Sequence, residues 1–267
     1  MQTYRFRQGA GPLLVSMPHV GTHLPEALRT RLTPAALALP DTDWHLERLD
    51  DFLDAIGASV LVATHSRYVV DLNRPPDDAN LYPGQDTTGL IPVDTFHREA
   101  LYLPGAAPDA AEGRERVERF WHPYHAKLAF EIARLKAAHG VAMLWDAHSI
   151  FSVLPRFFPG RLPDLNLGTA DGRACAPQVA AALETAAGAA TGYQWVLNGR
   201  FKGGYITRTY GRPDAGIHAA QLELAEVAYM DEAAPYGFRE DLAIRLRPHL
   251  KALIEAFVRA VPRPSKG

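Results

Sequence analysis

Residues 141–149 have the sequence VAMLWDAHS, and this stretch predicts both the fold class and the place of the functional site. Its first five residues, Val141–Trp145, are apolar, which is typical of a strand buried on both faces. Asp146 and His148 follow at once and are two residues apart, so in an extended chain they share one face. Ligands bind beyond the carboxyl ends of strands in open α/β sheets. We therefore expect chemistry where this strand ends.

Other short apolar runs bounded by turn residues predict further strands. They are Leu13–Met17, Ser59–Ala63, Tyr68–Leu72, Tyr193–Leu197 and Tyr205–Thr209. In Gln221–Ala225, Leu222 and Leu224 alternate with Gln221 and Glu223, which favours a strand with one polar face. This last segment is ambiguous from the sequence alone.

Apolar residues with helical spacing lie between these runs. They predict helices around residues 49–56, 117–135, 176–190 and 242–261, with Pro123 breaking or kinking the second helix. Strands interleaved with helices predict a single α/β domain over residues 1–267, with a mixed, mostly parallel twisted sheet flanked by helices. The stretch 74–103 is rich in Pro, Gly and Asp and predicts a long loop; loops of this length tend to be functional.

The composition excludes several classes of protein. With 47% hydrophobic and 22% charged residues in 267, the chain is not intrinsically disordered. Its 28 Lys and Arg against 30 Asp and Glu give a net charge of −2, so we expect neither nucleic acid nor an anionic membrane as partner. Its one cysteine, Cys175, excludes an intramolecular disulfide and a Cys-rich zinc site. A signal peptide and an apolar run of ~18 residues are both missing, so a cytoplasmic location is expected.

Two histidines at predicted strand ends suggest a metal site. His19 follows Leu13–Met17 just as His148 follows its own apolar run. In the segment 41–45, Thr42 or Asp43 could simply cap the helix that follows. Alternatively, a carboxylate from this segment would complete a zinc shell of two histidines and one carboxylate, with an open position for water.

Cationic residues and one glutamate also follow or line predicted strands. Arg74 is suited to gripping a carboxylate with two hydrogen bonds, although a surface ion pair is the alternative. The segment 198–208 contains three cations and three glycines, which suits an anionic substrate or, alternatively, a hairpin with a solvated basic face. Glu223 faces away from the two leucines beside it and could be a general base or a salt-bridged edge residue.

Taken together, these motifs resemble the N-formylglutamate amidohydrolase (N-formylglutamate deformylase) family. The matching segments are SMPHVGTHLP, DTDWHLERL, YVVDLNRPP, a PYH turn, WDAHS, GRFKGGYITRTYG and HAAQLELAEVAYMDE. They occur in the family's order from residue 16 to about residue 232. The family is similar in fold to zinc carboxypeptidases, which implies metal-assisted amide hydrolysis at strand ends of a mixed sheet.

The resemblance implies hydrolysis of N-formyl-L-glutamate to formate and L-glutamate, the last step of a histidine degradation route. It implies Zn²⁺ or another divalent metal, held by His19, Asp43 and His148. Thr22 stands where carboxypeptidases have a ligating glutamate, so the carboxylate must come from elsewhere. Asp43 is the first choice, and Asp41 and Asp146 are the substitutes.

The resemblance also assigns roles at the substrate. Glu223 is implied as the catalytic glutamate, and Asn73 and Arg74 as the pair that holds the terminal carboxylate. A substrate with two carboxylates needs at least two cationic contacts. We expect the second contact from the cluster of Arg200, Lys202 and Arg208 in the basic segment. Lys202 and Arg208 are the first choices, depending on which of them the strand register turns toward the pocket.

Two other functions stay open at this point. One is a related metal amidohydrolase acting on another N-acyl amino acid or a peptidoglycan fragment, and the number of cations in the pocket discriminates it. The other is a non-catalytic protein that binds dicarboxylates without zinc. The sequence makes no prediction of oligomeric state.

Overall fold

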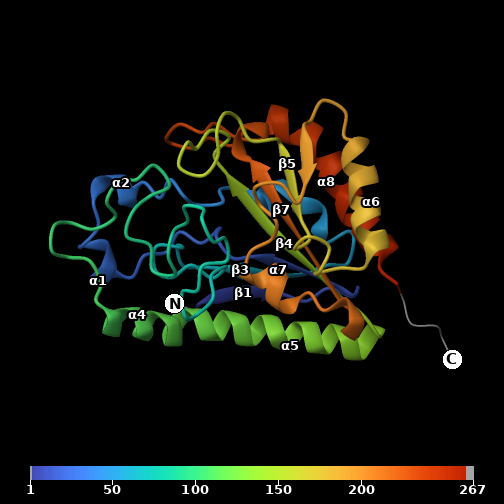
Figure 1. Ribbon diagram of the computed structural model, residues 1–267, viewed down its shortest axis with the longest axis horizontal. Helices are drawn as coiled ribbons and strands as arrows, with labels where there is room; N and C mark the ends of the chain where they lie inside the picture. The colour runs from blue at the N-terminus through green and yellow to red at the C-terminus, as the bar shows by residue number, and fades with distance from the viewer. Residues whose placement is uncertain (1, 263–267) are drawn as a thin grey trace.

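The computed structural model describes residues 2–262 and contains a seven-stranded sheet with helices on both faces (Figure 1). The strand order is β1-β3-β2-β4-β7-β5-β6. The strands are β1 (Tyr4–Arg7), β2 (Leu13–Met17), β3 (Ser59–Ala63), β4 (Ala142–Ile150), β5 (Leu165–Gly168), β6 (Trp195–Leu197) and β7 (Ile217–Ala225). β3, β2, β4 and β7 are parallel, whereas β1 and β5 each run antiparallel to a neighbour. This confirms the predicted α/β class with a mixed, mostly parallel sheet.

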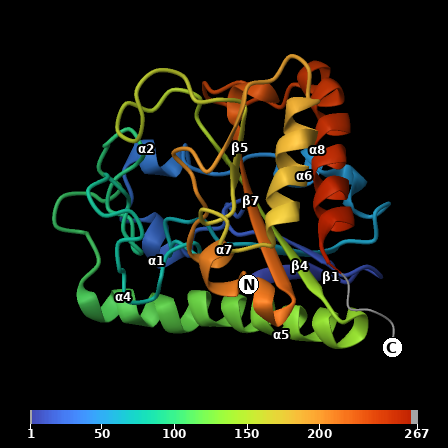
Figure 2. The same cartoon turned by 45° about the vertical axis from the view of Figure 1, so that its right-hand side comes forward.

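The described residues form eight α-helices, and the longer ones cover the two faces of the sheet (Figure 1). The eight helices are α1 (Glu26–Arg29), α2 (Pro34–Leu37), α3 (Leu46–Leu49), α4 (Ala110–Arg116), α5 (His122–His139), α6 (Pro177–Gly188), α7 (Tyr205–Tyr210) and α8 (Glu240–Ala260). α4 and α5 form one long rod along one face, and α6 and α8 lie side by side on the other (Figures 1 and 2). No helix within residues 2–262 is both long enough and apolar enough to cross a membrane.

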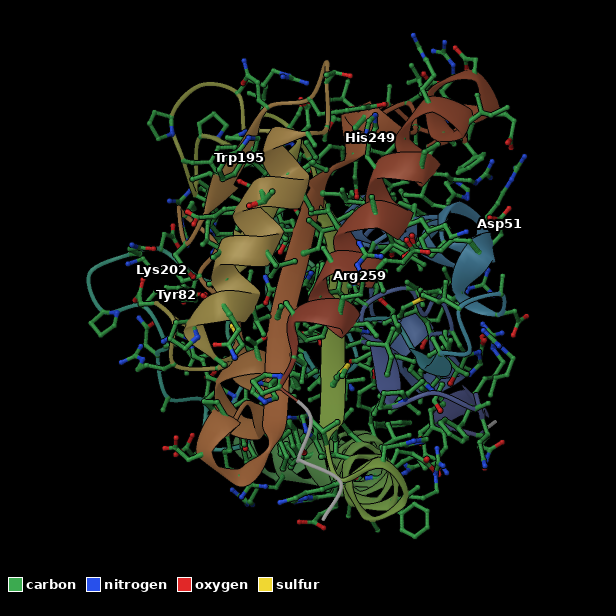
Figure 3. The ribbon with its side chains drawn as sticks, turned by 90° about the vertical axis from the view of Figure 1, so that its right-hand side faces the viewer. Asp51, Tyr82, Trp195, Lys202, His249 and Arg259 are labelled. Atoms are coloured by element: carbon green, nitrogen blue, oxygen red, sulfur yellow. The ribbon has the colours of Figure 1, made fainter. Side chains whose placement is uncertain are left out.

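Alternating side chains of the strands build two apolar layers. On one face, Trp145 of β4 and Leu222 of β7 pack into a cluster with α6 and α8, which Figure 3 shows in front of the sheet. On the other face, Leu144 of β4 and Ala219 of β7 pack with α5 and α7. Since odd and even positions are both buried, the central strands are apolar almost throughout. A polar side chain on these strands is therefore a candidate for a functional role.

Two predicted strands are not strands. Tyr68–Leu72 forms no sheet ladder, and its apolar side chains are buried in two different clusters instead. Tyr205–Thr209 lies in α7, where the Arg208 N–H donates to the Gly204 carbonyl. The aromatic and β-branched residues of this helix suggested a strand, but Ile206 packs onto the sheet from a single helical turn. Two short strands, β1 and β5, were not predicted.

The rod of α4 and α5 is continuous through Pro123. A π-helical turn, η2 (Val117–Trp121), joins the two helices, and the His122 N–H donates to the Val117 carbonyl. Pro123 lies in the first turn of α5, where a missing N–H costs least. The predicted break is therefore absent. The π turn places Trp121 beside the loop 72–74. There its indole N–H donates a hydrogen bond to the Arg74 carbonyl at 3.0 Å.

The other predicted segments agree with the structure to different extents. α6 and α8 occupy the helices predicted at 176–190 and 242–261, but α3 is much shorter than the segment 49–56 and precedes most of it. The strand predicted at 193–197 is shortened to β6. The stretch 74–103 contains no helix and no named strand, as predicted for a long loop.

A candidate metal centre beside an arginine-lined pocket

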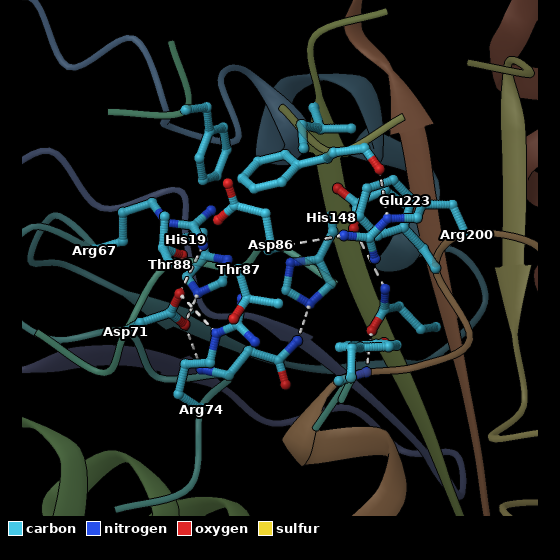
Figure 4. Close-up of a pocket in the computed structure, with 18 residues that line it drawn as sticks. His19, Arg67, Asp71, Arg74, Asp86, Thr87, Thr88, His148, Arg200 and Glu223 are labelled. Carbon is cyan, nitrogen blue, oxygen red and sulfur yellow. Dashed lines mark hydrogen bonds and ion pairs between the residues drawn. The ribbon is translucent and has the colours of Figure 1, made fainter. Parts of the chain in front are cut away.

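His19, Asp43 and His148 come from three separate segments that meet at the carboxyl ends of the central strands. Figure 4 shows the two histidines close together at this place. His19 follows β2, and His148 lies near the end of β4. These strands are parallel neighbours that pair Ser16 with Asp146, so both histidines reach the same edge. Asp43 lies in the loop before α3, and its backbone N–H donates to the His19 carbonyl at 3.1 Å.

The three side chains form a group that could hold a divalent metal ion. One ligand atom from each lies within 4.8 Å of the other two, and all three residues are buried. Asp43 Oδ2 lies 3.0 Å from His148 Nδ1 and 3.8 Å from His19 Nδ1. Tetrahedral ligands with bonds of about 2.1 Å lie about 3.4 Å apart. Asp43 Oδ1 is buried without a hydrogen-bond partner, so the residues present fit a cation.

Each histidine is backed by a second carboxylate. Asp71 Oδ1 lies 2.7 Å from His19 Nε2, and Asp146 Oδ2 lies 3.1 Å from His148 Nε2. If Nε2 donates in both rings, the Nδ1 lone pairs are left facing Asp43. This carboxylate–histidine arrangement is the usual way in which proteins orient metal-binding imidazoles. Asp146 is therefore a hydrogen-bond partner of His148, on the side of the ring away from Asp43.

Asp41 lies outside the three-residue group. Its two carboxylate oxygens accept hydrogen bonds from the Phe96 N–H at 3.1 and 3.0 Å. Burial raises the pKa of Asp41 to about 7, because desolvation outweighs Arg67 and these hydrogen bonds. Of the three aspartates considered for the carboxylate ligand, only Asp43 lies in the group with His19 and His148.

The charges around the two histidines differ. Burial is the largest cause that lowers the pKa of His19. For His148, burial acts in the same direction, but Asp146 and Asp43 outweigh it and raise the pKa. Burial alone would raise the pKa of Asp71, yet His19 and Arg67 together hold it well below its usual range. The lowered pKa of His19 favours the neutral imidazole, which is the form that binds a metal ion, and the lowered pKa of Asp71 keeps an ionised carboxylate behind it.

Asn73 connects this site to neighbouring segments through its side-chain amide. Its Nδ2 lies 3.3 Å from Asp146 Oδ2 and 3.0 Å from His148 Nε2, and its Oδ1 accepts the Ile206 N–H at 2.8 Å. The rod also fixes this loop, because His125 Nε2 lies 2.8 Å from the Leu72 carbonyl. Asn73 also lines the pocket, so the substrate contact that the resemblance implies for it stays a prediction.

Glu223 lies directly beside His148, since β4 and β7 pair these two residues in register. Leu222 and Leu224 pack into the core on the opposite face, so Glu223 points to the pocket as expected. Its carboxylate is 8% exposed and accepts a hydrogen bond from Gln221 Nε2 at 3.3 Å. Burial raises the pKa of Glu223 to about 8. A raised carboxyl pKa beside a candidate metal site is typical of an acid–base group.

A pocket of about 600 Å³, counting the open solvent at its mouth, extends from the histidines and Glu223. Its cationic lining residues are Arg67, Arg74 and Arg200. Arg67 is neutralised by Asp71 at 2.6 Å, and Arg74 lies 3.9 Å from the same carboxylate. Several cations that converge on one pocket suit a small anionic molecule.

Lys202 and Arg208 do not line this pocket among the residues that the structure describes. Lys202 Nζ pairs with Asp171 at 3.1 Å, and its side chain is 39% exposed (Figure 3). Arg208 Nε donates to the Gly203 carbonyl at 2.7 Å, and its guanidinium lies over the Tyr82 ring. We expected strand register to decide which of these two cations faces the pocket. Residues 205–210 form a helix, so that expectation was wrong.

Three residues that line the pocket were not singled out from the sequence. Arg67 lies between His65 and Tyr68 in a segment that contains no recognisable motif, so the sequence did not indicate a role for it. Gln221 shares a strand face with Glu223 two residues away, and this spacing could have marked it. Arg200 was one of three candidate cations of the basic segment but not the first choice, because its neighbours in the fold come from distant loops.

Comparison with known proteins places the chain in a family. The model of the family described as N-formylglutamate amidohydrolase matches residues 11–230. The chain is 54% identical over 253 residues to an N-formylglutamate deformylase of Pseudomonas aeruginosa, covering 95% of both proteins. It is 51% identical to one of Pseudomonas putida, covering 95% of this chain and 94% of that protein.

Solved structures agree with this comparison. An N-formylglutamate amidohydrolase from Ralstonia eutropha JMP134 superposes with a TM-score of 0.81 at 25% identity, over 97% of this chain and 99% of the other. The gene product Atu2144 from Agrobacterium tumefaciens has the same fold, with a TM-score of 0.69 at 20% identity over 97% and 96% of the two chains. The chain belongs to the N-formylglutamate amidohydrolase family.

Proposed function

We propose that this protein hydrolyses N-formyl-L-glutamate to formate and L-glutamate, and that it needs a divalent metal ion, with zinc as the first choice. Two curated relatives that are more than half identical carry the name N-formylglutamate deformylase, which supports the reaction. The observation that carries the metal-dependent mechanism is the buried group of His19, Asp43 and His148 beside Glu223.

The residues of the proposed centre have separate tasks. His19, Asp43 and His148 would hold the metal ion, and Asp71 and Asp146 orient the two imidazoles through Nε2. A divalent ion bound there lowers the pKa of a coordinated water and polarises a carbonyl oxygen. This chemistry matters because a formamide resists attack by neutral water.

Glu223 is the proposed proton carrier. Its carboxylate accepts a proton from the attacking water and delivers it to the nitrogen of the departing glutamate, so that the C–N bond breaks to give formate and an amine. The in-register pairing with His148 puts this carboxylate next to the proposed metal ligands. Gln221 holds one of its oxygens through a hydrogen bond at 3.3 Å.

Arg74 is the proposed anchor of the α-carboxylate, which all N-formyl amino acids share. It lines the pocket, and its nearest carboxylate is 3.9 Å away, beyond a close hydrogen bond. Asn73 supports this site indirectly through Asp146 and His148. The same reaction is the expected last step of a histidine degradation route, and a cytoplasmic location stays a prediction.

The test is a substrate panel with metal content measured in parallel. Purified protein should release formate from N-formyl-L-glutamate faster than from other N-formyl or N-acetyl amino acids, and should lose this activity to a chelator and regain it with Zn²⁺. A preference for an N-acetyl or peptidoglycan-derived substrate would point to a different amidohydrolase. Tight binding of N-formylglutamate without formate release, in protein that contains no metal, would point to a dicarboxylate-binding protein.

A further inference from the structure

Arg200 is the cation of the pocket that protein carboxylates leave unpaired. Within residues 2–262, no carboxylate lies within 4.0 Å of its guanidinium, whereas Arg67 and Arg74 both lie within that distance of Asp71. Burial lowers the pKa of Arg200, which means that its charged form is poorly solvated. An anion in the pocket would supply the missing partner.

Backbone carbonyls hold Arg200 in place. Its Nε donates to the Phe157 carbonyl at 2.7 Å, and its Nη2 donates to the Asp86 carbonyl at 3.2 Å. These two hydrogen bonds use part of the guanidinium and leave its other N–H groups without a hydrogen-bond partner among residues 2–262. An arginine fixed in this way loses little conformational entropy when it binds a ligand.

Aromatic rings surround the same guanidinium. The Arg200 Cζ atom lies 5.5 Å from the centre of the Tyr82 ring, 5.8 Å from that of Phe157 and 5.3 Å from that of Phe201. Rings at these distances favour the cation and shield part of it from solvent. A charge-assisted hydrogen bond made there is stronger than one made in open solvent.

The position of Arg200 complements that of Arg74. In Figure 4 the two arginines lie on either side of His148, and both line one pocket. In N-formylglutamate the formamide nitrogen branches from Cα, on the carbon chain that joins the two carboxylates. A substrate held at both ends would thus place its formyl group near the candidate metal centre.

We propose that Arg200 is the residue that determines specificity for an acidic side chain, by binding the γ-carboxylate of the N-formyl substrate. This proposal rests on the proposed function and deepens it, since it assigns the second carboxylate to one residue. It selects Arg200 from the three cations of the basic segment, because Lys202 and Arg208, the first choices from the sequence, are not among the residues that line the pocket.

The experiment compares N-formyl-L-glutamate with its neutral isostere N-formyl-L-glutamine in the wild type and in Arg200→Gln. Loss of one charge-assisted hydrogen bond should lower kcat/KM for the glutamate substrate by about 10- to 150-fold. The value for the glutamine substrate should change by less than about 3-fold, because that substrate presents no charge to Arg200. The ratio of the two kcat/KM values should therefore collapse toward one, and Arg200→Lys should restore part of it.

Two further variants serve as comparison. Lys202→Gln removes the competing cation, and Arg173→Gln removes a cation whose side chain is 70% exposed. Both should keep the wild-type preference. If Arg200→Gln keeps the preference, if it lowers both kcat/KM values equally, or if Lys202→Gln abolishes the preference, the assignment is overturned.

A binding measurement separates this proposal from the proposed function. By titration calorimetry, wild-type protein should bind L-glutamate more tightly than L-glutamine, and Arg200→Gln should bind the two with similar affinity. This comparison needs no turnover. It would still support Arg200 as the carboxylate contact if the protein released no formate, and an unchanged difference in Arg200→Gln would refute the contact even in an active deformylase.

Discussion

Glu223 is a buried carboxylate whose neighbours along the strand are leucines of the core. Replacing it with glutamine keeps the shape and removes the proton acceptor. Glu223→Gln should lower kcat by about 10²–10⁴-fold, the usual contribution of a general acid–base group, and should leave metal content unchanged. Steady-state kinetics with metal analysis on the same preparation measure both.

Glu184→Gln, at an exposed position on α6, is the matched control and should behave as the wild type. Near-normal turnover of Glu223→Gln would mean that another carboxylate is the base. Loss of metal together with activity would mean that Glu223 is a ligand or a structural partner of the centre.

Asp71 orients His19 from the side opposite Asp43. Asp71→Asn should weaken metal binding by about 10- to 100-fold, which is typical for the partner of a metal-binding histidine. Competition with a chromogenic chelator gives this affinity directly. Asp171→Asn, which removes a half-exposed carboxylate paired with Lys202, should leave the affinity unchanged. Equal affinities of Asp71→Asn and the wild type would show that the contact to His19 does not support a metal site.

At the scale of elements, apolar patterning predicts the parallel centre of the sheet well. β2, β3 and β4 are runs of apolar residues because both of their faces are buried, and such runs are visible without any knowledge of partners. The same reasoning fails at 68–72 and 205–209, where apolar residues are buried by tertiary contacts of a loop and a short helix. In both segments the apolar residues indicated burial correctly, but they did not indicate pairing in a sheet.

The candidate site also contains residues that local patterns predict and residues that only tertiary contacts bring together. His19 and His148 are predictable because each comes directly after or near the end of a buried strand. Their contact with Asp43 depends on how the loop before α3 returns to the sheet, which no local pattern contains. The contacts of Arg200 come from loops at residues 82–88 and 157, so its place in the pocket is a property of the fold.

The contact between α8 and the sheet gives a prediction about stability. Phe257 of α8 is fully buried, and its ring lies 5.6 Å from that of Trp145 in β4. Phe257→Ala should lower the free energy of unfolding by about 3–5 kcal/mol, since it removes a large side chain and leaves a cavity. Phe130→Ala, at a side chain that is 61% exposed, should cost less than about 0.5 kcal/mol in the same denaturant titrations. Similar losses in both variants would contradict the packing of α8 described here.

At the scale of the whole molecule, a metal that binds only the folded chain must stabilise it. At a free metal concentration of 100 times the dissociation constant, this stabilisation is about 2.7 kcal/mol. For a chain of this length, removal of the metal with a chelator should lower Tm by roughly 5–10 °C. Differential scanning calorimetry with and without added Zn²⁺ measures the shift. A Tm that does not respond to chelator or metal would argue that no ion binds the native protein.

The central claim is that His19, Asp43 and His148 hold the metal ion on which deformylation depends. Metal content and formate release, measured together in the wild type, His148→Ala and His122→Ala, test it most directly. His122 is a half-exposed histidine on α5 that is not among the residues lining the pocket, so it serves as the control. We predict close to one metal ion per chain with full activity in the wild type and in His122→Ala, and neither metal nor activity in His148→Ala. Full metal occupancy with undiminished formate release in His148→Ala would contradict the account.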